Sequence, residues 1–290
     1  YGSTIPGEYM SIKTILVSLN AKDRADVVLR IACELAREHE AHLIGIYVVP
    51  DVKPVAMFEA YLATDFFEEQ QKHFNRCGDK MQRLFKKETA KYSLTSEWVQ
   101  VRASNQILAD DVIALSGQAD LIVINQTEAW ATSLDPEPDF ADRLIMASGR
   151  PVLMVPNSGE FRTVGKKVII GWKPTREAVR AVHDALPMLV KSENVILVTI
   201  DTQDASYAEA SPSTHQMVEM LRRHGINAAE QAVVISDIPV EEALLNEAAV
   251  HGSDLIVVGA YGHSRLRELL LGGVTRFLLN HSTVPVLMSH

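Results

Sequence analysis

Asp254-Leu-Ile-Val-Val258 and Asp120-Leu-Ile-Val-Ile124 are two near-identical stretches of this chain, 134 residues apart. Pro285-Val-Leu-Met288 repeats Pro151-Val-Leu-Met154 at the same spacing. Two matched segments separated by an equal interval are typical of a duplicated domain. Each short apolar run is rich in aliphatic residues and too short for a buried helix, so each run predicts a β-strand.

The duplication divides the chain into two predicted domains, residues 10–157 and 166–290, which suits a length of 290 residues. The turn-forming residues of Asn157–Gly165 predict a linker between them. Pairing Lys13-Thr-Ile-Leu-Val17 with Lys167-Val-Ile-Ile-Gly171 gives an offset of 154, so we expect 20 extra residues in the first copy. We expect this insertion after Val49, through Phe66 and Phe67.

Short apolar runs alternate with amphipathic segments in both copies. The first copy has predicted strands at Thr14–Leu19, His42–Val49, Trp98–Val101, Leu121–Ile124 and Val152–Val155, and predicted helices at Arg24–Glu38 and Gln106–Ser116. The second has predicted strands at Val168–Trp172, Val195–Ile200, Ala232–Ile235, Leu255–Val258 and Val286–Met288, and predicted helices at Arg176–Val190, Ser213–Arg223, Val240–Ala249 and Val274–Asn280. The sequence therefore predicts an α/β protein with two similar domains, each a five-stranded, parallel, doubly wound sheet with helices on both faces.

Composition narrows the functional classes. The formal net charge is -9, from 28 basic and 37 acidic residues, so nucleic acid and anionic lipid are not expected partners and any phosphate site must be local. Cys33 and Cys77 form no CxxC pair, and no His/Cys spacing predicts a metal site, which favours a reducing compartment. No apolar run is long enough for a bilayer, and Tyr1–Glu8 shows no export signal and is interpreted as a ragged end. We therefore expect a cytoplasmic protein.

Glycines gather where a ligand would bind in such a sheet, after the strand that ends at Val258. Gly259-Ala-Tyr-Gly262 is followed by nine residues and then by Gly272-Gly273-Val274-Thr275, which opens the last predicted helix. Glycines allow close backbone approach, and the N–H groups of Gly273, Val274 and Thr275 would point at an anion from a positive helix terminus. The alternative is that Gly272 and Gly273 only end one helix and begin the next.

This loop resembles the nucleotide loop of the universal stress protein family, Gly-x2-Gly-x9-Gly-(Ser/Thr). Gly259, Gly262 and Gly272 match it, whereas Gly273 replaces the hydroxyl residue and Thr275 could substitute in part. The resemblance covers the chain as a tandem of two such domains. It implies a Rossmann-like fold of the adenine nucleotide alpha hydrolase type, ATP or another adenine nucleotide as ligand, with or without Mg²⁺, and a cytoplasmic stress response. It also implies self-association through Val152–Val155 and Val286–Met288, within or between chains, which would cover apolar edge strands.

Further site residues follow from the same resemblance. The family's nucleotide-binding members have an Asp at the end of the first strand, where this chain has Asn20 and Lys173. An ammonium cannot accept a hydrogen bond from ribose, so Lys173 would instead supply a cation to phosphate or be an exposed turn residue. The purine would lie near Ile200 and contact main-chain atoms. His263 directly follows Gly262 and could donate to phosphate or be a solvated loop residue.

The first copy is expected not to bind a nucleotide in this way. The positions of Gly259, Gly262, Gly272 and Gly273 are occupied there by Asn125, Glu128, Pro138 and Asp139. Carboxylates repel phosphate, and proline removes a backbone donor. The loop Trp130–Asp139 and the aromatic residues of the insertion could line a different, apolar pocket. The alternative is that these aromatic residues belong to the core or to an interface. Those aromatic residues are Phe58, Tyr61, Phe66 and Phe67.

Binding without turnover is the leading hypothesis, because the sequence contains no recognised catalytic motif and we assign no catalytic residue. One alternative is a slow ATPase that uses the segment Gly259–Thr275, in which Glu268 is the one carboxylate. Another is an interaction or small-ligand module that binds no nucleotide, which the departures at Lys173 and Gly273 would favour.

Overall fold

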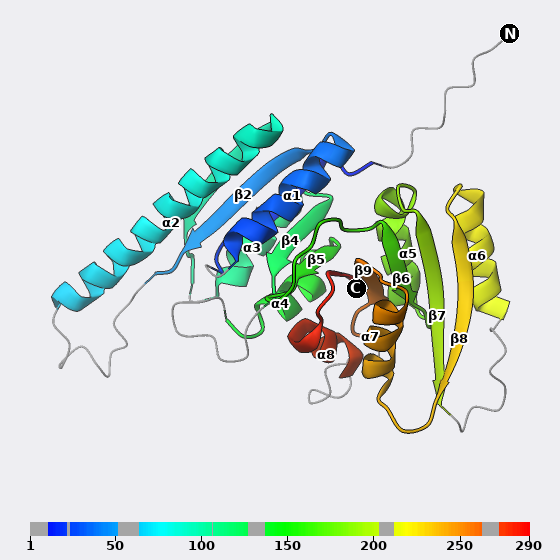
Figure 1. Cartoon of the computed structure of the whole chain (residues 1–290). Coiled ribbons are helices and arrows are strands. Elements are labelled where there is room, and N and C mark those ends of the chain that lie inside the picture. The colour runs from blue at the N-terminus through cyan, green and yellow to red at the C-terminus, as the bar shows by residue number, and fades with distance from the viewer. Residues whose placement is uncertain are drawn as a thin grey trace, which may run out of the picture. The chain divides into compact units, whose positions relative to one another are not determined.

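A computed structural model describes residues 11–21, 24–51, 64–105, 107–126, 137–202, 212–262 and 273–290, without the side chains of residues 64–66 and 212. The chain divides into two compact units (Figure 1), one of residues Lys13–Arg150 and one formed chiefly by Pro151–His290. Both units alternate strands with helices, as the apolar periodicity predicted.

The first unit contains a parallel sheet in the order β3-β2-β1-β4. Its strands are β1 (Thr14–Ser18), β2 (His42–Val49), β3 (Ser96–Arg102) and β4 (Leu121–Asn125), and its helices are α1 (Ala25–His39), α2 (Thr64–Tyr92), α3 (Leu108–Ser116) and α4 (Phe140–Ala147). In α1, buried residues recur every three or four positions at Val28, Leu29, Ala32 and Leu35, which gives one apolar face. Burying each such leucine or valine stabilises the fold by about 1.5–3 kcal/mol.

The second unit has the strand order β5-β10-β9-β6-β7-β8. Its strands are β5 (Val152–Val155), β6 (Lys167–Gly171), β7 (Asn194–Thr202), β8 (Ala228–Ile235), β9 (Leu255–Gly259) and β10 (Val286–Ser289), and its helices are α5 (Arg176–Leu189), α6 (Pro212–Arg223), α7 (Val240–Val250) and α8 (Gly273–His281). All neighbouring strands are parallel except β5 and β10. The α/β architecture with a mostly parallel sheet is the predicted one.

The strands β5 and β10 pair antiparallel, with Val286 opposite Met154 and Met288 opposite Val152. The terminal strands of the two repeats therefore pair within one chain, which is one of the two arrangements that the resemblance implied. On its other side β10 pairs with β9. Because both edges of β10 are occupied, this strand offers no free edge to a second molecule.

The strand register corrects the alignment of the two copies. Ile15 pairs with Leu121, and the equivalent pair in the second unit is Val168 with Leu255. The first strands therefore match at an offset of 153 and not at the predicted 154, which makes the insertion 19 residues long. Runs of Val, Ile and Leu look alike when shifted by one position, and only the hydrogen-bonded register separates the two alignments.

The repeated aspartate holds the first strand of each copy by its backbone. The Asp120 carboxylate accepts the N–H groups of Lys13 and Thr14 at 2.8 and 3.0 Å. The Asp254 carboxylate accepts those of Lys166 and Lys167 at 3.2 and 2.9 Å. Charge-assisted bonds of this kind are the stronger ones in proteins, which explains why the Asp precedes the same strand in both halves.

The two copies differ most in the helix after their second strand. This helix, α2, has 29 residues in the first unit, and its counterpart α6 has 12. In Figure 1, α2 runs along β2. The expected insertion therefore contributes to α2, where Phe67 is half-buried, whereas Phe58, Tyr61 and the side chain of Phe66 lie outside the described residues. In the part of the chain that the structure describes, no helix is both long and apolar enough to cross a bilayer.

We predict that the two thiols react very differently. Cys33 is buried in α1, and loss of hydration raises its pKa to about 12, helped by the negative charge of Glu88. A raised thiol pKa keeps the group protonated, so at pH 8 only about one Cys33 in ten thousand is the reactive thiolate. Cys77 on α2 is partly exposed. Titration with a thiol reagent at pH 8 should therefore modify Cys77 in the folded protein and Cys33 only after unfolding.

Equal rates for the two thiols in the folded protein would contradict this prediction. A Cys77→Ser variant, which retains Cys33 alone, is the matched control and should remain almost unlabelled until denaturant is added.

Candidate nucleotide site

The carboxyl ends of β6 and β9 lie side by side, with Gly171 opposite Val258. A Cβ on Gly171 would meet Leu244 of α7, whereas a Cβ on Gly259 would meet the first turn of α5. The two helices therefore lie on opposite faces of the sheet (Figure 1). The helix α5 follows β6, whereas α7 precedes β9, so the order of the strands reverses between β6 and β9. Ligands bind in the crevice at such a point in this class of sheet.

Gly259 allows the sheet and α5 to approach each other closely. A Cβ at this position would lie 2.5 Å from the carbonyl carbon of Glu177 and 2.8 Å from the Cα of Ala178. Both contacts are with backbone atoms, which cannot rotate away. A side chain at position 259 would therefore have to push α5 from β9, and the predicted need for glycine at this position has a packing reason.

The start of the glycine loop is fixed by the last strand and the last helix. Ala260 donates its N–H to the carbonyl of Ser289, and the Ala260 carbonyl lies 3.0 Å from Nδ1 of His290. Tyr261 has a positive φ of 58°, which is uncommon for a residue with a side chain. Its N–H points to the hydroxyl of Thr275 at 3.5 Å. The backbone turns sharply here and leads into Gly262, which is exposed.

The helix α8 begins at Gly273, so the N–H groups of Gly273, Val274 and Thr275 lie in its first turn, as predicted. Gly273 is exposed, Val274 is half-buried, and Thr275 is buried. The first N–H groups of a helix lack intrahelical partners and carry partial positive charge. The Thr275 hydroxyl faces the Tyr261 N–H and supports the loop from inside. His263 and Gly272 lie outside the described residues.

Lys173 follows β6, and Ile200 lies near the end of the neighbouring strand β7. Lys173 is exposed in the turn after β6, and its carbonyl accepts the Thr175 N–H at 2.6 Å. Ile200 is half-buried near the end of β7, where it is the register partner of Val233. Trp172, which precedes Lys173, donates its N–H to the carbonyl of Val198 in β7 at 2.8 Å. The structure therefore places the lysine turn and the end of β7 at the same edge of the sheet as Gly259.

Glu177 is a candidate site residue that the sequence analysis missed. It lies in the first turn of α5, which Thr175 caps by accepting the Ala178 N–H. The Glu177 side chain is buried, and one carboxylate oxygen would lie 3.0 Å from a Cβ on Gly262. Its Oε1 lies 3.3 Å from Nε of Arg176, and a carboxylate at this place can also ligate a divalent cation. An acid shortly after a Thr cap was the available signal, but it resembles any helix start.

A second carboxylate, from Glu241 in the first turn of α7, lies near the start of α8. Its Oε1 would be 3.9 Å from a Cβ on Gly273. Among the described residues, no group of three His, Cys, Asp or Glu side chains could hold a metal ion. A Mg²⁺ ion at this site would therefore need oxygen ligands from the phosphates of a nucleotide and from water in addition to any carboxylate, as Mg²⁺ commonly does.

In the first unit, an asparagine side chain forms hydrogen bonds with the backbone of the residue that corresponds to Ile200. The Asn20 carboxamide donates to the Val48 carbonyl at 2.7 Å and accepts the Val48 N–H at 3.0 Å. By strand register, Asn20 corresponds to Lys173 and Val48 to Ile200. A lysine ammonium has no acceptor, so Lys173 cannot bind the Ile200 backbone in the same reciprocal way.

Two acidic residues of the first-unit loop also have local structural roles. Glu137 accepts the N–H groups of Leu108 and Ala109 at the start of α3, at 3.3 and 2.9 Å. Asp139, which takes the place of Gly273, pairs with Arg143 at 2.7 Å. Glu128 and most of the loop Trp130–Asp139 lie outside the described residues.

Residues 166–290 match the universal stress protein family. Universal stress protein Slr1230 of Synechocystis sp. is 27% identical over 205 residues, which are 69% of this chain and 69% of that protein. A universal stress protein from Archaeoglobus fulgidus DSM 4304 has a TM-score of 0.71 at 14% identity, covering 95% of both chains. Another from Archaeoglobus fulgidus, solved in complex with dAMP, has a TM-score of 0.32 and 20% identity and covers 50% of this chain and 98% of its own.

The family whose glycine spacing the loop resembles is therefore the one that residues 166–290 match. Over 95% of its length the chain has the α/β fold of the universal stress protein from Archaeoglobus fulgidus DSM 4304.

We predict that Gly259→Ala lowers the free energy of unfolding by about 1–3 kcal/mol, because the new methyl group overlaps the backbone of α5. Chemical denaturation followed by circular dichroism measures this loss. Gly117→Ala is the matched control, since a Cβ there meets no atom within 4 Å, and it should change stability by less than about 0.5 kcal/mol. Equal stability of the two variants would mean that the close approach is not needed.

Proposed function

We propose that residues 166–290 bind ATP or another adenine nucleotide in the crevice between β6 and β9, and that the protein acts in a cytoplasmic stress response. The observation that supports this most directly is the start of α8 at Gly273, which gives the N–H groups of a helix terminus to the end of the glycine loop. Gly259 and the sharp turn at Tyr261 bring the beginning of the same loop to the crevice.

The nucleotide would lie across the carboxyl ends of the strands. Its phosphates would accept N–H groups of Gly273 and Val274, with His263 and Gly272 completing the loop. Its base would lie near Ile200 and contact the main chain of β7. The exposed ammonium of Lys173 lies at the same sheet edge and would attract the phosphates.

Mg²⁺ would accompany the nucleotide, because Glu177 and Glu241 bring two carboxylates close to the loop. Bound Mg²⁺ would offset the repulsion between these carboxylates and the phosphates, and Glu177 is the residue best placed to ligate it. Binding alone is sufficient for the role we propose.

We predict that Gly273→Asp weakens ATP binding about tenfold or more, because it adds a negative charge at the helix terminus that faces the phosphates. Isothermal titration calorimetry of the full chain with ATP, ADP, AMP and dAMP, each with and without Mg²⁺, tests this. Gly117→Asp is the matched control: it adds the same charge at an open position of the first unit and should leave affinity unchanged.

Absence of binding by every nucleotide in the wild-type chain would refute the proposal. Equal losses in both aspartate variants would point to a long-range charge effect and not to a phosphate site at α8.

We further predict that Lys173→Ala lowers affinity for ATP about three- to tenfold but leaves affinity for adenosine unchanged, because the ammonium would interact with phosphate and not with ribose. The loss should shrink as salt is raised, since Lys173 is exposed. Competition titrations with both ligands measure it. Lys80→Ala, which removes an exposed lysine from α2, is the control. Equal weakening of ATP and adenosine would place Lys173 beside the nucleoside instead.

A further inference from the structure

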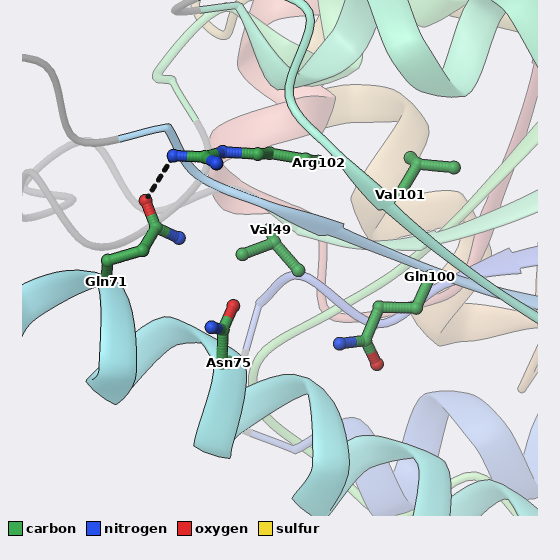
Figure 2. A pocket seen from close by; sticks show the side chains of 6 residues that line it. All are labelled: Val49, Gln71, Asn75, Gln100, Val101 and Arg102. Atoms are coloured by element: carbon green, nitrogen blue, oxygen red, sulfur yellow. Dashed lines mark hydrogen bonds between the residues drawn. The ribbon is translucent and has the colours of Figure 1, made fainter.

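A second cleft lies in the first unit, between α2 and the carboxyl ends of β2 and β3, and encloses about 310 Å³. Figure 2 shows the six residues that line it: Val49, Gln71, Asn75, Gln100, Val101 and Arg102. It involves the outer strands β2 and β3, whereas the crevice that corresponds to the nucleotide site lies between β1 and β4. It therefore does not correspond to the site described above.

The cleft forms where the contact between α2 and the sheet changes from apolar to polar. Phe85 of α2 packs on Trp98 of β3, with ring centroids 5.4 Å apart, and Phe74 is also buried. Three residues before Phe74, on the same side of α2, the chain has Gln71. On the facing strand, Trp98 is followed at alternate positions by Gln100 and Arg102. Polar side chains thus occupy positions where continued packing would need apolar ones.

On one side of the cleft the polar side chains are paired with one another, and the charges of Arg102 and Asp51 cancel. Arg102 binds a single oxygen of Asp51 through Nε at 2.9 Å and Nη2 at 2.7 Å. The Gln71 carboxamide donates to the Pro50 carbonyl at 3.1 Å, and its oxygen faces Arg102 Nη2 at 3.4 Å (Figure 2). An anionic ligand would have to compete with Asp51 for Arg102 and would face the repulsion of that carboxylate. The arrangement therefore disfavours anions.

The other side carries two carboxamides that remain available. Among the described residues, neither the Asn75 nor the Gln100 side chain has a hydrogen-bond partner, and both extend toward the space between α2 and the strands (Figure 2). Gly78 makes room for one of them, because a Cβ there would lie 2.8 Å from the Gln100 carboxamide. A glycine inside a helix costs about 1 kcal/mol relative to alanine. The helix tolerates this cost at the point where Gln100 needs space.

We propose that this cleft binds a small, uncharged, hydroxyl-rich molecule such as a monosaccharide or cyclic polyol. A carboxamide both donates and accepts hydrogen bonds, as does a hydroxyl group, so Asn75 and Gln100 can each bind a hydroxyl of the ligand. Val49 and Val101 provide an apolar surface for its C–H groups. The volume lies at the lower end of small-molecule sites, about 300–1,000 Å³, and suits one sugar ring.

Saturation-transfer difference NMR on the full chain tests this inference, with D-glucose and myo-inositol as neutral probes and acetate as the anionic probe. Asn75→Leu and Gln100→Leu remove the hydrogen-bonding groups and keep side-chain volume. Asn246→Leu makes the same exchange at an exposed position of α7 and is the matched control. Circular dichroism melting curves of all variants establish that they fold.

We expect saturation transfer to at least one neutral probe, about tenfold weaker binding in both cleft variants, and unchanged binding in Asn246→Leu. The proposal is overturned if neither neutral probe binds, or if binding persists in both folded cleft variants. Binding of acetate in place of the neutral probes would overturn the ligand class. Nucleotide affinity is measured separately. Because the cleft lies in the first unit and the proposed nucleotide site lies in the second, either proposal can fail while the other holds.

Discussion

No side chain fits between Gly259 and the first turn of α5, and this close approach determines the geometry of the second unit's candidate site. It brings the end of β9 against Glu177 and Ala178, while Gly171 meets α7 on the opposite face. The chain after Gly259 must then turn within three residues, which Tyr261 achieves with a positive φ. The lysine turn, which leads directly into α5, and residues Ala260–Gly262, which directly follow Gly259, therefore both lie next to this contact.

The two halves place different residues around the corresponding crevice, which lies between β1 and β4 in the first half and between β6 and β9 in the second. In the first half, Asn20 uses both polar groups of its side chain to bind the backbone of Val48. Glu137 binds the start of α3, and Asp139 pairs with Arg143. These residues satisfy hydrogen-bonding groups internally. In the second half, the Lys173 ammonium has no acceptor and Gly273 has no side chain, so neither residue can bind the corresponding backbone groups in the same way.

Sequence reasoning predicted the strands because buried parallel strands appear as short apolar runs. It singled out the glycine loop because the spacing of Gly259, Gly262 and Gly272 matches that of a known family. It misplaced the first-strand alignment by one residue, since neighbouring aliphatic residues carry no signal for register. It missed Glu177 because an acid at a helix start is common. It also missed the carboxamide cleft, since Gln71 and Gln100 come from segments 29 residues apart and neither residue type marks a site by itself.

The antiparallel pair of β5 and β10 has a consequence for how the duplicated chain assembles. A separate copy of the second half would expose the edge of its last strand and would depend on collision with another molecule to cover it. Joining the halves in one polypeptide makes that encounter intramolecular, with an effective concentration set by the connecting segment and not by expression level. Duplication thus makes strand pairing independent of dilution, and it frees one repeat to diverge without loss of the shared edge.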